Sequence, residues 1–261
     1  MTSSARGATT RAGAGVYAGL FLVTLSTLML EIALTRIFSV TMWYHFAFVA
    51  ISVALFGMTV GALVVHLLPQ RFPPEGVRRQ LWLYSLLFGV SVVVCFAIQL
   101  SIHFTPLFTV PGVASVVGTC VVISIPFVFS GVVVCLALTR FPAQVNRLYA
   151  VDLVGAGVGC LVLVLLFSWI DGPSLVVVIG ALAASASLAF ALAGRSRRRL
   201  LSAGVAVAVL GGFAATNAVL YTGGSPLLKI IWTKEVRDHE HLTERWNAFS
   251  RLVVDGNPDD A

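Results

Sequence analysis

Glu31 is the residue whose position most clearly suggests chemistry, because this carboxylate lies inside a long apolar run. If that run crosses a membrane, the charge costs at least a few kcal/mol and should face other helices or water. Two interpretations stay open: Glu31 joins helices through hydrogen bonds, or it binds a ligand or a proton. Arg36 lies about 140° further around a helix, so the two side chains are poorly placed to pair.

Three further polar residues lie near the ends of other apolar runs. Gln99 and His103 are four residues apart, which places them on one face of a helix. His45 belongs to the aromatic cluster at 43–45. Together with the two charged residues above, these side chains could line a polar vestibule. The alternative is an ordinary aromatic belt with interfacial histidines.

A later apolar run contains both an acid and closely spaced glycines. Asp152 lies about one turn after the predicted start of the run, where it complements the helix dipole and is also a candidate ligand site. Gly155 and Gly159 are four apart and favour close helix packing over a nucleotide-binding loop, since no strand precedes them. Pro126, in the run before, predicts a helix kink.

Long apolar runs must position all of these residues. Of the 261 residues, 58% are hydrophobic and 11% are charged, whereas soluble domains carry about a quarter charged residues. Several runs reach the ~20 residues that a membrane-spanning helix needs, and they lack the alternation of membrane strands. We therefore predict an all-α, polytopic transmembrane bundle of about seven spans: Val16–Val40, Tyr44–Leu68, Leu81–His103, Val113–Thr139, Leu148–Ile170, Ser174–Gly194 and Leu200–Tyr221.

The first of these runs is interpreted as a retained helix. A cleaved signal peptide is the rival interpretation, but the run is too long for one and carries Glu31 and Arg36.

Arginines in the connections predict the orientation. Nine of them fall in the alternate connections around 69–79, 140–147 and 195–199, and the remaining connections contain no Lys or Arg. The positive-inside rule places these connections and the N-terminus in the cytoplasm. Seven spans then put the tail outside, but the tail carries Lys229, Lys234 and Arg237, and one span more or fewer would put it inside. The predicted location is a multi-pass position in the plasma (cytoplasmic) membrane.

Charge and cysteine usage exclude other classes of protein. The net charge of +6 comes from short connections rather than from a basic folded surface, which argues against nucleic-acid binding. The four cysteines lie inside apolar runs without metal-type spacing, so they predict neither a metal site nor a disulfide framework (Cys95, Cys120, Cys135 and Cys160).

The chain divides into three segments. Residues 1–15 form a flexible basic lead, 16–221 the transmembrane domain, and 222–261 a polar tail. Within the tail, Phe249–Val254 is apolar and β-branched, which predicts a strand. A lone strand has nothing to pair with. The tail therefore resembles the start of a soluble domain or a segment that docks on a partner.

Four segments, in this order, resemble the membrane region of spermidine synthase-like proteins. In that family a multi-span N-terminal part precedes a polyamine aminopropyltransferase-type domain. The likeness runs over most of the chain, and its most specific elements are Tyr-x-x-Asp-Leu-x-Gly-Ala and Trp-Asn-x-Phe-Ser-Arg. The matching segments are Leu34–Ser39, Tyr44–Phe48 (followed by Ala50–Ser52 and Gly57), Arg147–Ala156 and Arg245–Val254.

The resemblance implies a soluble Rossmann-like domain after the Trp-Asn-x-Phe-Ser-Arg element. Such a domain uses decarboxylated S-adenosylmethionine to transfer an aminopropyl group to an amine. The present chain ends at Ala261, and the family's Gly-rich loop and acidic catalytic residues have no counterpart in it. We therefore assign no catalytic residue, metal or cofactor to this chain, and we expect no enzymatic activity from it alone.

Three functions stay open at this point. The chain could anchor or supply a transferase domain, or a catalytic subunit that contacts the tail. It could transport a small molecule such as a polyamine or another cation, with Glu31 and Asp152 as contacts. It could also be a structural membrane scaffold. In each case the lipid bilayer is its first partner.

Overall fold

Seven long helices form the bundle, and each is long and apolar enough to cross a membrane. The computed structural model describes residues 11–102, 109–194, 196–222, 225–233, 236–238, 243–247 and 250–254. Within them the helices are α1 (Ala14–Thr41), α2 (Phe46–Leu67), α3 (Val77–Ser101), α4 (Val110–Arg140), α5 (Val145–Phe167), α6 (Gly172–Gly194) and α7 (Arg197–Thr222). The predicted all-α polytopic bundle is confirmed.

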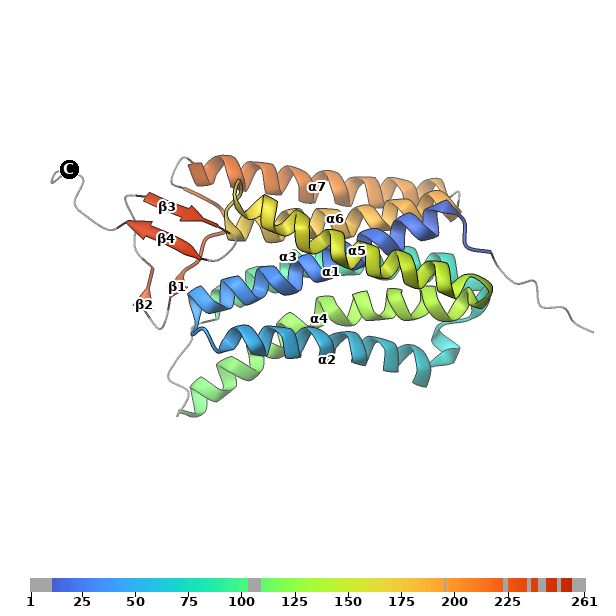
Figure 1. Ribbon diagram of the computed structural model, residues 1–261, viewed down its shortest axis with the longest axis horizontal. Helices are drawn as coiled ribbons and strands as arrows, with labels where there is room; N and C mark the ends of the chain where they lie inside the picture. The colour runs from blue at the N-terminus through green and yellow to red at the C-terminus, as the bar shows by residue number, and fades with distance from the viewer. Residues whose placement is uncertain are drawn as a thin grey trace, which may run out of the picture.

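Short proline-initiated turns connect the helices at one end of the bundle. The 3₁₀ turns are η1 (Pro69–Arg71), η2 (Pro74–Gly76) and η3 (Pro142–Gln144). Proline suits these positions because it fixes φ and lacks an N–H that would otherwise need a partner. The arginine-rich connections lie at this end, together with the start of α1 (Figure 1), and we call it the basic end. The opposite end, where α7 finishes, is the tail end.

The helix α1 lies at the centre of the bundle, where it packs against α2, α4, α5 and α6. A second layer of contacts joins α3 to α4 and α6, and α7 packs mainly on α6 (Figure 1). In α1 and α6, 61% of the most apolar stretch is buried inside the protein, against 17% in α7 and 22% in α5. The surfaces of α5 and α7 are therefore mostly available to lipid.

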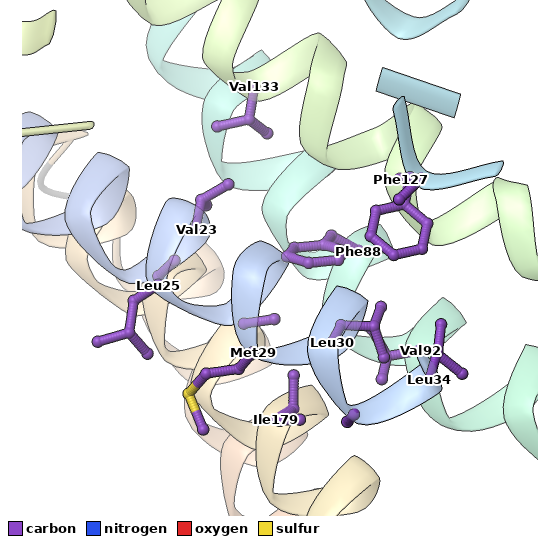
Figure 2. Close-up of a cluster of buried hydrophobic side chains, with 14 of the residues drawn as sticks. Val23, Leu25, Met29, Leu30, Leu34, Phe88, Val92, Phe127, Val133 and Ile179 are labelled. Carbon is purple, nitrogen blue, oxygen red and sulfur yellow. The ribbon is translucent and has the colours of Figure 1, made fainter. Parts of the chain in front are cut away.

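The apolar core forms where α1 meets three other helices. Figure 2 shows Met29 of α1 beside Ile179 of α6, and Phe88 of α3 beside Phe127 of α4; with Leu34 of α1 they belong to one buried cluster. All five side chains are buried. Lipid tails are as apolar as these residues, so close van der Waals packing holds the helices together rather than exclusion of water.

Glycines allow the closest helix contacts. Gly155 and Gly159 of α5 lie against α1: a Cβ at Gly155 would lie 2.7 Å from the Phe21 carbonyl oxygen, and one at Gly159 equally near that of Leu25. Gly61 of α2 packs on α4 in the same way, and a Cβ there would collide with the Val128 carbonyl oxygen. The second contact was not predicted from the sequence.

The helix α4 continues through Pro126 without interruption. Figure 1 shows α4 changing direction partway along its length. The buried Ser130 hydroxyl, one turn further on, lies 2.5 Å from the Thr27 hydroxyl of α1. This polar pair joins the central helix to α4 beyond the proline.

The tail forms two small antiparallel hairpins at the tail end of the bundle (Figure 1). The first pairs β1 (Trp232–Thr233) with β2 (Val236–Arg237), and the second pairs β3 (Thr243–Trp246) with β4 (Arg251–Val254). The strand expected within Phe249–Val254 is present as β4. The expectation that it has no partner was wrong, because the polar sequence of β3 carries no apolar signal for a strand.

Candidate functional site

Asn217, near the end of α7, fixes the beginning of the tail. Its side chain is fully buried; Nδ2 donates to Ser174 Oγ of α6 at 2.8 Å, and Oδ1 accepts the Leu228 N–H at 2.7 Å. Nδ2 also lies 3.4 Å from the Leu228 carbonyl oxygen. An amide among apolar helices needs such partners, since an unsatisfied polar group there is costly. Asn217 therefore ties the tail to both α6 and α7.

Asp171, in the connection between α5 and α6, is a second buried polar group at this end. Its Oδ2 accepts the Ser174 N–H at 2.9 Å and so caps the first turn of α6. Burial raises the pKa of Asp171; the hydrogen bonds from Ser174 lower it, and the nearby charge of Glu244 raises it. The net effect is a raised pKa, so the surroundings favour the protonated carboxyl group.

Trp246 provides an apolar contact between tail and bundle. Its ring is stacked on that of Phe167, the last residue of α5, with centroids 6.2 Å apart. The ring also covers Gly172, where a Cβ would lie 3.0 Å from the indole Cη2. Only 8% of Trp246 is exposed. Glycine at 172 thus lets the indole lie flat on the start of α6.

The described residues of the Trp-Asn-x-Phe-Ser-Arg element lie at the end of β3 and the start of β4. Trp246 and Arg251 are partners in the strand register. Between them, Asn247 Oδ1 accepts the Ser250 N–H at 2.7 Å, and the Asn247 N–H donates to the Ser250 carbonyl oxygen at 3.0 Å. An asparagine side chain that bonds to the backbone in this way is typical of tight turns. The most specific element of the sequence therefore shapes the docked hairpin.

Arg251 connects the two hairpins through a buried ionic network. Its Nη2 lies 2.7 Å from Asp238 Oδ2 in the first hairpin, and its Nε lies 2.5 Å from Glu244 Oε1 in the second. Glu244 Oε1 also accepts the Trp246 indole N–H at 2.8 Å. Burial opposes the charge, but the hydrogen bonds to both carboxylates outweigh it, and the pKa of Arg251 is raised. The arginine therefore stays charged and holds the hairpins together.

Glu31 lies on a polar stripe of α1, two-thirds of the way towards the tail end. Thr24, Thr27, Thr35 and Ser39 follow the helical repeat on the same face. The hydroxyls bond to carbonyl oxygens of their own helix, and Thr27 also contacts α4. Glu31 is half-buried, and among the described residues its carboxylate has no hydrogen bond or ion pair.

Arg36 is half-buried on α1, one to two turns beyond Glu31. Its Nε is buried without a hydrogen-bond partner among the described residues. Within the same residues it forms no ion pair with Glu31, in keeping with their five-residue separation.

The expected vestibule residues do not all come together. Gln99 is 5% exposed and lines a small pocket with Thr41 and with Trp232 of β1. Its Oε1 has no hydrogen-bond partner among the residues that the structure describes. Glu31, Arg36 and His45 are not among the residues that line this pocket. His45 is exposed at the start of α2, and His103 lies outside the described residues.

Asp152 is far from Glu31, the other acid that lies within one of the seven helices. The helices α1 and α5 run in parallel, with Gly155 near Phe21 and Gly159 near Leu25. Asp152 and Glu31 are therefore about 20 Å apart along the bundle. Because α5 begins at Val145 rather than Leu148, Asp152 lies beyond the first turn. The expected interaction with the helix dipole is thus wrong, since that effect fades within one turn.

Sequence reasoning missed the residues that dock the tail. Asn217 had a usable signal, because an asparagine inside an apolar span needs a buried partner. Asp171 and Glu244 had none, since Asp171 lies in a short Asp-Gly-Pro connection between apolar runs and Glu244 lies in the polar tail. Within the described residues, no three His, Cys, Asp or Glu side chains cluster as a metal site would require.

Comparisons with known proteins add nothing to this geometry. The membrane-spanning character rests on the seven helices themselves, and the resemblance to spermidine synthase-like proteins rests on the quoted motifs. The sequence matches no protein-family model, and searches of curated proteins and of solved structures found no match either.

Proposed function

We propose that this chain is the membrane domain of a spermidine synthase-like protein and holds an aminopropyltransferase-type domain or subunit at the tail end. The single observation that carries the proposal is the docked tail. Trp246 and Asn217 attach the two hairpins to the bundle at separate points. A tail held in this way would give any domain that follows or binds it a fixed position at the membrane.

The proposal assigns a task to the residues that are most specific in the sequence. In a flexible linker, the Trp-Asn-x-Phe-Ser-Arg element would need no defined partners. Here Trp246 contacts the bundle, Asn247 closes the turn, and Arg251 joins both hairpins. Removing one member of a buried ionic network typically costs about 3–5 kcal/mol, so these residues give the tail one arrangement.

The implied reaction would take place in the domain or subunit that the tail holds. The amine nitrogen of the acceptor forms a bond to the aminopropyl carbon of decarboxylated S-adenosylmethionine. The bond from that carbon to the sulfonium sulfur breaks, methylthioadenosine leaves, and the amine loses a proton. The bundle contributes the location of this chemistry and none of its catalytic groups.

The test isolates the protein in mild detergent from its own membrane and measures its intact mass and its aminopropyltransferase activity. We expect methylthioadenosine release, with a diamine or triamine as acceptor, to co-purify with the bundle. Where a separate subunit supplies the activity, Trp246→Ala should stop it from co-purifying; where the domain follows in the same polypeptide, Trp246→Ala should speed hydrogen–deuterium exchange of the tail. In both cases the unfolding temperature of the bundle should stay unchanged. The matched control is Trp169→Ala, at the same end and 88% exposed. Absence of product with every amine, or equal loss in Trp169→Ala, would overturn the proposal.

A second candidate function is the binding and passage of a small cation. The Glu31 carboxylate, which has no partner within the described part of the chain, favours it. An intramembrane acid without a protein partner is a candidate site for a proton or a cationic substrate. The neighbouring Thr27 and Thr35 place hydroxyl oxygens on the same face of α1. A polyamine would present ammonium groups that match this combination of carboxylate and hydroxyls.

Flux measurements in proteoliposomes test this second function. Glu31→Gln should abolish uptake of labelled polyamine while the protein remains folded. The matched control is Glu75→Gln in the exposed turn η2, which should keep full uptake. Equal flux in the wild type and Glu31→Gln would exclude Glu31 as the site.

A further inference from the structure

A groove at the basic end has the lining of an anion-binding site. The segment before α1 lies against η3, where the Ala12 N–H donates to Gln144 Oε1 at 2.6 Å and Gln144 Nε2 donates to the Ala12 carbonyl oxygen at 3.4 Å. This reciprocal pair of hydrogen bonds holds the segment before α1 against η3, and the two form the walls of a groove of about 500 Å³. Its lining includes Arg11, Pro142, Gln144, Val145, Asn146 and Arg147.

Two guanidinium groups on the rim of the groove lack anionic partners. Arg11 and Arg147 are exposed, and within the described residues neither forms an ion pair. In the sequence, no acid precedes Glu31, and none lies between Glu75 and Asp152. Asp152 is five residues beyond Arg147 and does not line the groove. The positive charge of the groove is therefore not neutralised locally.

The start of α5 adds to this positive field. The helix begins at Val145, and the side chain of Gln144 does not cap it because its amide is engaged with Ala12. The first turn of a helix carries a partial positive charge that favours anions. Arg147 lies in that first turn, so its guanidinium and the helix end act in the same place.

The groove opens beside a surface that suits acyl chains. Leu153, Leu161 and Leu165 of α5 are each more than half exposed along the helix that leads away from the groove. Little of α5 is covered by other helices. A molecule with its phosphate in the groove could therefore lay apolar chains along α5.

We propose that this groove binds the phosphate of an anionic phospholipid headgroup, with Arg11 and Arg147 as its ligands. Arginine suits phosphate because its planar fork donates two parallel hydrogen bonds. Gln144 acts as a positioning residue, since it holds the wall that carries Arg11. The site does not depend on the tail or on the proposed transferase.

Native mass spectrometry of the detergent-solubilised chain, titrated with phosphatidylglycerol or phosphatidylcholine, tests the proposal. We expect tighter binding of phosphatidylglycerol, with affinity reduced about 5-fold by Arg11→Gln or Arg147→Gln and about 30-fold by both. Gln144→Ala should also weaken binding, although no charge changes. The matched control is Arg79→Gln, an exposed arginine at the same end outside the groove. It should bind like the wild type.

Three results would overturn the proposal. Equal affinity for the two lipids would show that the groove does not recognise the net negative charge of the phosphatidylglycerol headgroup. An equal loss in Arg79→Gln would mean diffuse attraction to the whole basic end. Displacement of the lipid by millimolar inorganic phosphate would assign the groove to a free phosphate compound instead. Thermal unfolding of each variant confirms that the bundle is intact.

Discussion

Replacing Asn217 with alanine should release the tail from the bundle without unfolding it. The substitution removes the acceptor of the Leu228 N–H and the donor to Ser174 Oγ. A buried N–H left without a partner costs about 1–3 kcal/mol, and the longer contact to the Leu228 carbonyl adds less than ~1 kcal/mol. We therefore expect the docked tail to lose about 1–4 kcal/mol, which corresponds to about 5- to 900-fold more frequent opening.

Hydrogen–deuterium exchange of the purified protein in nanodiscs measures this opening directly. Peptides that cover 225–238 should exchange faster by that factor, whereas peptides from α1 and α6 should not change. The matched control is Thr222→Ala, because among the described residues the exposed Thr222 hydroxyl bonds only to Val219 of its own helix. Unchanged exchange of the tail in Asn217→Ala, with the bundle intact, would refute the idea that this amide holds the tail.

The remaining predictions concern packing, pH and orientation. Gly61→Ala should destabilise the bundle by about 1–3 kcal/mol, because the new Cβ meets the backbone of α4. Gly211→Ala, which places its Cβ in open space, should be neutral or stabilising. Thermal unfolding of both variants in detergent measures the difference. Since the pKa of Asp171 is raised, its carboxylate weakens tail docking at neutral pH. The tail should therefore dock more firmly in Asp171→Asn than in the wild type at pH 7. Hydrogen–deuterium exchange should show this difference vanish as the pH falls through the raised pKa of Asp171 towards 3.8, because the wild-type carboxyl group is then also neutral. In intact cells, an impermeant thiol reagent should label Ser250→Cys but not Arg79→Cys; the reverse would invert the predicted orientation.

The seven helices were predictable because the membrane constrains each span separately. A span must satisfy its own backbone hydrogen bonds and cover about 30 Å with apolar side chains, so run length alone identifies it. The boundaries were less certain, as the early start of α5 at Val145 shows. In the sequence, the turn η3 and the first three residues of α5, Val145–Arg147, look like an ordinary connection.

The candidate site was predictable only in part. Glu31 could be recognised because a lone acid in an apolar helix is conspicuous. The idea of a shared vestibule with Gln99 and His45 depended on helix neighbours that no local pattern specifies. Glycine pairs illustrate the same limit: Gly155 and Gly159 suggest a packing face, but only the assembled bundle identifies α1 as the partner.

The sequence by itself determined that this protein crosses a membrane in seven helices, with the arginine-rich connections at one end and the tail at the other. Hydropathy and charge act residue by residue, and neither needs knowledge of distant contacts. Only the tertiary structure decided that the tail docks on the bundle through Asn217, Trp246 and Arg251. Those contacts join residues far apart in the chain. Each helix satisfies its own backbone hydrogen bonds, so the geometry of these contacts arises only when the helices pack together.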